Sequence, residues 1–215
     1  MRGDIPENPE IRGPGIKLQN GESKHAWGSL TGVRNLADGE SAVHFEQLLM
    51  PHLDAAYNLA RWLVRNEQDA EDLVQDSCLR AFKSMDGFRG GDARAWLLAI
   101  VRNTCYSWLQ RRNKIVETTT EFNEETHSQE TISSTVEQEL LQRVERQRIQ
   151  DELEAMPLEF REAMVLREIE DLSYKEIADV TGVPMGTVMS RLSRGRRWLR
   201  ERLLQPAGKE ENRAL

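Results

Sequence analysis

The chain has 215 residues, of which 39% are hydrophobic and 30% charged, and its formal net charge is −7 at pH 7. This length and composition suit one ordinary domain or two small ones, and no apolar run approaches the roughly 20 residues that span a bilayer. Without a signal-peptide stretch either, we expect a cytoplasmic protein with no membrane insertion. The negative charge ordinarily argues against a protein that binds DNA unaided, because Lys and Arg supply most affinity for phosphates.

Three amphipathic helices are predicted in the first half of the chain. Residues 1–40 are rich in Gly and Pro, which predicts a flexible tail. From Ala42 onward, apolar residues recur at helical spacing and predict an all-α bundle over residues 41–113, with Pro51 near the first turn or at a kink. The three stripes are Leu49, Leu53, Ala56, Tyr57, Ala60, Leu63 and Val64; then Ala70, Leu73, Val74, Cys78, Ala81, Phe82 and Met85; then Leu97, Ile100, Val101, Thr104, Cys105 and Trp108.

Two segments without helical periodicity follow or interrupt these helices. The loop 86–92 is glycine-rich and carries Phe88 and Arg89, but it lacks the Gly-Lys-Ser/Thr ending of a phosphate-binding loop. Residues 114–137 are rich in Thr, Ser and Glu, a composition typical of a self-repelling flexible linker. The chain therefore divides into two all-α domains, the second covering residues 138–205 before a C-terminal tail at 206–215.

The second domain has the spacing of a helix-turn-helix. Pro157 is expected to open a helix through Ile169, followed by helices over 174–180 and 185–204. Gly182 can adopt the left-handed backbone of the turn. Ala178 is small where the last two helices cross, Pro184 suits entry into the second of them, and the residues expected to lock them together are Ile177, Val183, Val188 and Leu192.

The last predicted helix has a buried stripe and an arginine-rich remainder. An exposed arginine face on such a helix is typical of phosphate and major-groove contact, although the same arginines would also suit the negative end of a helix dipole. The coincidence of turn chemistry, packing and charge favours DNA binding. The stripe is Val188, Leu192, Gly195, Leu199 and Leu203, and the arginines are Arg191, Arg194, Arg196, Arg197, Arg200 and Arg202.

Three stretches together are similar to a known family. They are DAEDLVQD at 69–76 followed by RAF at 80–82; FRG at 88–90 followed by WLLAIVRN at 96–103; and LEAMP at 153–157 continuing to GTVMSRL at 186–192. In this order they resemble the extracytoplasmic-function (ECF) group of the sigma-70 family over residues 42–204. The resemblance implies two helical domains, region 2 and region 4, in a protein that directs core RNA polymerase to −35 and −10 promoter elements and is held by an anti-sigma factor.

The resemblance also implies three sets of contacts. The polymerase set would otherwise be a solvated acidic face, and Trp96 and Trp108 would suit a core equally well. Met189 stands where the family commonly has a cation. For polymerase the residues are Asp69, Glu71, Asp72, Gln75, Asp76 and Arg80; for the −10 element Phe88, Arg89, Trp96, Asn103, Arg111 and Arg112; and for the −35 element Thr187, Ser190, Arg191, Ser193, Arg194 and Arg197.

Two other classes are less favoured. One is a stand-alone helix-turn-helix regulator whose N-terminal bundle senses a ligand or dimerises. No dimerisation helix is obvious, and this class would leave the 69–76 motif unexplained. Cys78 and Cys105 form no Cys-x-x-Cys pair, and the four histidines have no triad or metal spacing. We therefore expect no enzyme activity, no metal site and no cofactor, with both cysteines serving as core residues.

Overall fold

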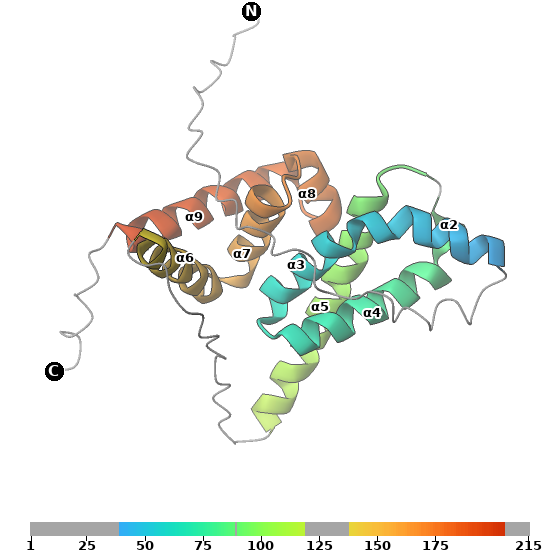
Figure 1. The fold of residues 1–215 in the computed structure, drawn as a ribbon, viewed down its shortest axis with the longest axis horizontal. Helices are drawn as coiled ribbons and strands as arrows, with labels where there is room; N and C mark the ends of the chain where they lie inside the picture. The colour runs from blue at the N-terminus through green and yellow to red at the C-terminus, as the bar shows by residue number, and fades with distance from the viewer. Residues whose placement is uncertain (1–38, 89, 119–137, 205–215) are drawn as a thin grey trace, which may run out of the picture.

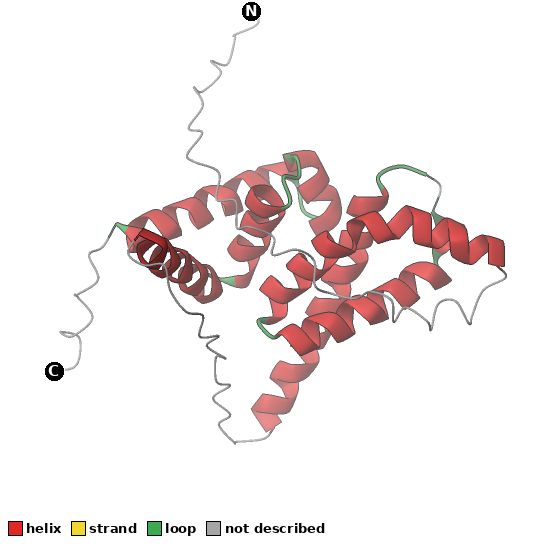
Figure 2. Ribbon diagram, in the orientation of Figure 1, coloured by secondary structure: helices red, strands yellow, loops and turns green. Residues whose placement is uncertain are grey.

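The computed structural model describes residues 39–88, 90–118 and 138–204 (Figure 1). Within these ranges all regular elements are helical (Figure 2), so the predicted all-α class is confirmed. Residues 1–38 of the predicted N-terminal tail, the predicted C-terminal tail, most of the predicted linker and Arg89 lie outside the described residues, whereas residues 39 and 40 already belong to a helix. The first bundle contains α2 (Gly39–Leu49), α3 (Leu53–Val64), α4 (Glu67–Lys83) and α5 (Ala93–Thr118), and the second contains α6 (Gln138–Ala155), α7 (Leu158–Met164), α8 (Tyr174–Thr181) and α9 (Met185–Leu203).

Pro51 divides the first predicted helix in two. Helix α2 ends at Leu49, a 3₁₀ turn (Met50–His52) contains the proline in its first turn, and α3 begins at Leu53. Proline has no N–H to donate to the preceding turn, so a change of helix at this point is the expected result. Further on, the Asn66 side chain accepts a hydrogen bond from the Asp69 N–H at 2.9 Å and thereby caps α4.

Two helices extend beyond the sequence prediction. Helix α5 continues to Thr118, past the expected end near Asn113, because residues 114–118 contain neither Gly nor Pro to stop it. Helix α6 was not predicted, since its charged and Gln-rich composition resembles the linker before it. Its last turn nevertheless buries Leu153, which is 6% exposed.

The helix-turn-helix forms as its local chemistry predicts. Ser173 and Glu176 make a reciprocal capping box at the start of α8, and Gly182 ends that helix with a φ of 68°. Helix α9 follows directly after Pro184. Of the predicted locking residues, Ile177, Val188 and Leu192 are buried, and Val183 is half-buried and packs against the same core.

A π-helical turn, η4 (Val165–Ile169), joins α7 to the loop before α8. The Glu170 N–H donates to the Val165 carbonyl five residues earlier, at 3.0 Å. The sequence predicted an uninterrupted helix as far as Ile169, so the widened turn is a departure from that expectation. It accommodates one more residue than a regular turn would.

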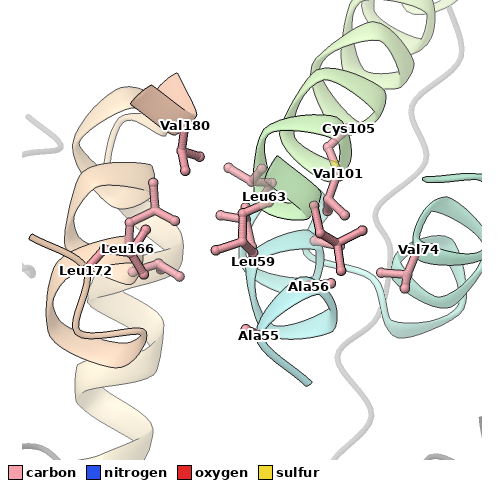
Figure 3. Packing of buried hydrophobic residues seen from close by; sticks show 14 of the residues in the cluster. Ala55, Ala56, Leu59, Leu63, Val74, Val101, Cys105, Leu166, Leu172 and Val180 are labelled. Carbon is pink, nitrogen blue, oxygen red and sulfur yellow. The ribbon is translucent and has the colours of Figure 1, made fainter. Parts of the chain in front are cut away.

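The two bundles share one hydrophobic core. Helix α5 contacts α8, and α3 contacts α7, so the second bundle lies directly against the first. Figure 3 shows Leu166 and Val180 of the second bundle opposite Leu59 and Leu63 of α3. The sequence predicted two domains and a linker but not this direct packing. No helix in the described ranges is long and apolar enough to cross a membrane.

Candidate nucleic-acid and polymerase interfaces

Helix α9 separates its apolar stripe from its polar face. Val188, Leu192 and Leu199 are buried, as predicted, whereas Ser190, Ser193, Arg194 and Arg197 are exposed and Thr187 is half-buried. The Ser190 hydroxyl donates to the Thr187 carbonyl at 2.8 Å. Arg197 faces Glu201 at 3.6 Å, but both side chains are well exposed, so this pair contributes little and leaves the guanidinium available to phosphate.

Arg191 differs from the other candidates on α9 because it faces inward. Its side chain is 23% exposed, and its Nη1 lies 3.7 Å from Oε2 of Glu162 on α7, a residue with no exposed surface. Burial raises the pKa of the Glu162 carboxyl, while the neighbouring Arg102 guanidinium opposes that shift. Arg191 is thus tied to an acidic side chain in this arrangement.

The candidates for −10 DNA lie along α5 and the loop before it. The rings of Phe88 and Trp96 are 4.8 Å apart at 36°, and both pack against the core while remaining half-buried. Trp96 is therefore partly a core residue and partly accessible to solvent. Asn103 is exposed seven residues further on, which is about two helical turns along α5.

Two arginines lie further along α5. Arg111 is exposed, and the Arg112 guanidinium lies 5.2 Å from the centroid of the Trp108 ring. Arg112 also lies 3.9 Å from a carboxylate oxygen of Asp69 on α4. One candidate for DNA and one for polymerase therefore meet at this end of the first bundle.

Two charged residues of α5 escaped the sequence prediction. Arg102 donates from Nε to Oε1 of Glu162 at 2.7 Å, and Arg94 donates from Nη2 to Oε2 of Glu170 at 2.6 Å. Arg102 lies in the 96–103 stretch, directly before the candidate Asn103. Its position there could have marked it as a candidate functional residue. Its partner could not be found from sequence, because the pairing spans the two bundles.

The polymerase candidates share the outer face of α4. Asp72, Gln75 and Arg80 are exposed, and Asp69, Glu71 and Asp76 are half-buried. Arg80 pairs with Asp76 at 2.9 Å. The opposite side of α4 buries Leu73, Val74 and Cys78 in the core, so the candidate face carries mainly negative charge towards solvent.

Neither cysteine has the properties of a reactive group. Both side chains are fully buried, and burial raises the pKa of the Cys78 and Cys105 thiols to about 12. They pack as small apolar residues, as the sequence predicted. Among the described residues, no cluster of three His, Cys, Asp or Glu side chains could hold a metal ion.

Comparison with known proteins explains why these features occur together. Residues 48–115 match the family model of sigma-70 region 2, and residues 146–199 match that of sigma-70 region 4. The chain is 33% identical over 156 residues to the ECF RNA polymerase sigma-E factor of Haemophilus influenzae, covering 69% of this chain and 80% of that protein. This chain belongs to the ECF group of the sigma-70 family.

A further relative and two solved structures are also similar to this chain. SigE of Mycolicibacterium smegmatis is 35% identical over 170 residues, which cover 78% of this chain and 65% of that longer protein. Among solved structures, the sigma factor RpoE in complex with the anti-sigma factor NepR from Bartonella quintana superposes with a TM-score of 0.62 at 31% identity, covering 74% of this chain and 96% of that one. CnrH in complex with the cytosolic domain of CnrY gives a TM-score of 0.52 at 26% identity, covering 81% and 94%.

Proposed function

We propose that this ECF protein is a sigma factor that brings core RNA polymerase to promoters carrying specific −35 and −10 elements, without an enzymatic activity of its own. The observation that carries the proposal is the presence, in one chain, of both region 2 and region 4, each with a polar face suited to a different macromolecule. A stand-alone DNA-binding protein needs only one of these faces.

Region 4 is the proposed duplex-binding part. The exposed Ser190, Ser193, Arg194 and Arg197 on α9 can contact base edges and phosphates in a major groove, as second helices of helix-turn-helix units do. Thr187 and Arg191 border the same face. We assign these six residues to the −35 element.

Region 2 is the proposed site for the −10 element. Holding an unstacked base requires an aromatic platform, polar groups for the base edge and cations for the backbone. Phe88 and Trp96 supply paired rings, Asn103 an exposed amide, and Arg111 and Arg112 the cations. Arg89 completes the proposed set from outside the described residues.

The acidic face of α4 is the proposed polymerase contact. Because polymerase would tether both DNA-binding parts to one promoter, each part can bind weakly and still contribute through effective concentration. This arrangement reconciles the net charge of −7 with a DNA-directed function. The action we propose is cytoplasmic, where polymerase and promoter DNA are found together.

An anti-sigma factor is the proposed regulator. RpoE of Bartonella quintana and CnrH, both similar in structure to this chain, form complexes with NepR and CnrY. Such a partner would have to cover faces that polymerase or DNA would otherwise occupy. A stress or envelope response is the setting that such control suits.

Transcription in vitro tests the proposed function directly. Purified protein is added to bacterial core polymerase on a genomic DNA library, and the 5′ ends of the products are mapped. New start sites that share −35 and −10 elements are the expected result. No new start sites, together with tight binding of the free protein to duplex DNA, would instead establish a stand-alone regulator.

A pair of variants then tests the placement of the DNA contacts. Arg191→Ala should weaken transcription from the mapped promoters while leaving binding to core polymerase unchanged, because Arg191 lies on α9 and the polymerase candidates lie on α4. Arg65→Ala, an exposed cation between α3 and α4 that belongs to none of the proposed contact sets, is the control for loss of a charge outside region 4. Loss of polymerase binding by Arg191→Ala would refute this division of labour.

A further inference from the structure

Two methionines are exposed at the start of α9, the second helix of the helix-turn-helix. Met185 is 49% exposed and Met189 is 45% exposed. Residues four positions apart lie on one face of a helix, so the two side chains are neighbours on the surface. Ser193, at the next position in this row, is also exposed, and its side chain is too short to cover Met189. An apolar patch of two methionines therefore interrupts the polar face of α9.

The packing of α9 does not use these methionines. Val188, Leu192 and Leu199 hold the helix and are buried, whereas neither methionine is part of the hydrophobic core or packs against it. An apolar side chain gains free energy when it leaves water, so the exposed patch adds little to stability. Elsewhere in the described ranges, the exposed large hydrophobic side chains are Val43, Met50 and Leu204, none of which belongs to the first turns of α9.

The first six residues of α9 carry no charge. They are Met185, Gly186, Thr187, Val188, Met189 and Ser190. The arginines of the helix begin at Arg191, which faces Glu162 at 3.7 Å, and the exposed cations Arg194 and Arg197 lie further on. Helix α9 thus has an uncharged first part and a cationic second part.

This order matches the way in which such helices meet DNA. The second helix of a helix-turn-helix directs its N-terminal residues to base edges in the major groove. Arg and Lys read guanine there, Asn and Gln read adenine, and Asp and Glu read cytosine, but residues 185–190 include none of these types. Thymine presents a C5 methyl group, which apolar side chains contact. Methionine suits this contact because its side chain is long, flexible and polarisable.

We propose that Met185 and Met189 determine sequence specificity at the −35 element by packing against the C5 methyl groups of thymines in the major groove. The inference rests on the proposed function, because it names the bases that region 4 distinguishes. Arg194 and Arg197 hold the helix on the phosphates, and phosphate contacts position a protein without reading sequence. The methionines supply discrimination that the arginines do not.

Replacing thymine with uracil tests the contact one methyl group at a time. Uracil pairs with adenine as thymine does and differs only in lacking the C5 methyl group. Each thymine of the −35 element, on either strand, is replaced in turn in a promoter mapped by transcription in vitro. Fluorescence anisotropy measures the Kd of the holoenzyme, formed from core polymerase and the full-length protein. Loss of one buried methyl group should raise Kd about fourfold at one or more of these positions.

Alanine variants show which side chain touches the methyl group. At a position sensitive to uracil, Met185→Ala or Met189→Ala should bind the thymine and uracil promoters with equal Kd, because the side chain that distinguishes them is gone. Met50→Ala is the matched control, since Met50 is 43% exposed but lies in the first bundle. This control should retain the preference of wild type for thymine.

The outcomes separate this inference from the proposed function. No effect of uracil on wild-type holoenzyme, or an unchanged preference for thymine in both alanine variants, would overturn the methionine contact, although transcription from the mapped promoters would still establish a sigma factor. If the protein directs no transcription, the proposed function falls, and the same substitutions are made in a duplex that the free protein selects from random sequences. Loss of the thymine preference in an alanine variant would then still support the contact, whereas failure to select any duplex would overturn it as well.

Discussion

Gly195 of α9 lies directly against Met164 of α7. A Cβ atom at position 195 would come within 2.7 Å of Met164 Cγ and 3.1 Å of its Sδ. The absence of a side chain here lets α9 approach α7 closely, and this contact orients α9 relative to the rest of region 4. The sequence placed Gly195 in the buried stripe, and the structure gives the steric reason.

Replacing this glycine should therefore destabilise the fold. In Gly195→Ala, crowding against Met164 costs about 1–3 kcal/mol, while higher helix propensity returns about 1 kcal/mol, so we expect a net loss of about 1 kcal/mol. Urea unfolding monitored by circular dichroism measures the difference. Gly186→Ala, on the same helix but with nothing within 4 Å of the added Cβ, should not lower stability.

Alkaline pH should weaken the fold through the buried thiols. The pKa of Cys78 and of Cys105 rises from 9.0 to about 12 on burial, so above pH 9 the unfolded chain loses protons that the folded chain retains. The free energy of unfolding then falls by about 1.4 kcal/mol per pH unit for each thiol, over the window from pH 9 to about 12.

The difference between two proteins isolates this effect. Urea unfolding of wild type and of the double variant Cys78→Ala/Cys105→Ala at pH 8, 9.5 and 10.5 should show a steeper loss of stability for wild type. Equal slopes would mean that the thiols ionise as readily in the folded protein as in the unfolded one. Burial also raises the pKa of Tyr106 to about 12. Its effect on stability is the same in wild type and in the double variant, so it does not alter the difference between them.

Charge reversal on α4 should impair polymerase binding. Asp72 is exposed on the acidic face, so Asp72→Lys should slow association with core polymerase about tenfold at low salt and less at high salt. Surface plasmon resonance at two salt concentrations measures the rate constants. Glu159→Lys, an equal charge change at an exposed position of α7, should have little effect, and an equal effect would show that only net charge matters.

Met189 offers a test by gain of contact. It is 45% exposed on α9, between residues assigned to the −35 element. Met189→Arg adds a cation where the ECF family commonly has one, so binding to a −35 duplex should become more dependent on salt, with the slope of log K against log salt steeper by about 0.9. Val43→Arg, at a residue 53% exposed on α2, should leave the slope unchanged.

Local chemistry explains what could be predicted from the sequence. The positive φ of Gly182, the start of α9 after Pro184 and the burial of Ile177 and Leu192 all depend on residues near one another in the chain. The cysteines follow the same rule, because their apolar neighbours repeat at helical spacing. These features were correctly predicted, and so was the all-α class.

Features that depend on distant residues could not be predicted in this way. The ion pairs of Glu162 and Glu170 join residues 60 and 76 positions apart, and no periodicity links them. Arg191 was expected on an open face, but it lies beside Glu162 for the same reason. Helix α6 was missed because its stability comes from contact with α9 rather than from a strong apolar stripe of its own.

Because of the π-helical turn η4, the geometry of region 4 depends on the number of residues between α7 and α8. A regular α-helix rotates by about 100° per residue, so deleting one residue from 165–169 would let the turn become regular and would rotate all that follows relative to α7. The capping box, the turn and α9 could each still form, but α8 and α9 would have a different orientation relative to α7. In this segment, a one-residue insertion or deletion would alter function more than most substitutions.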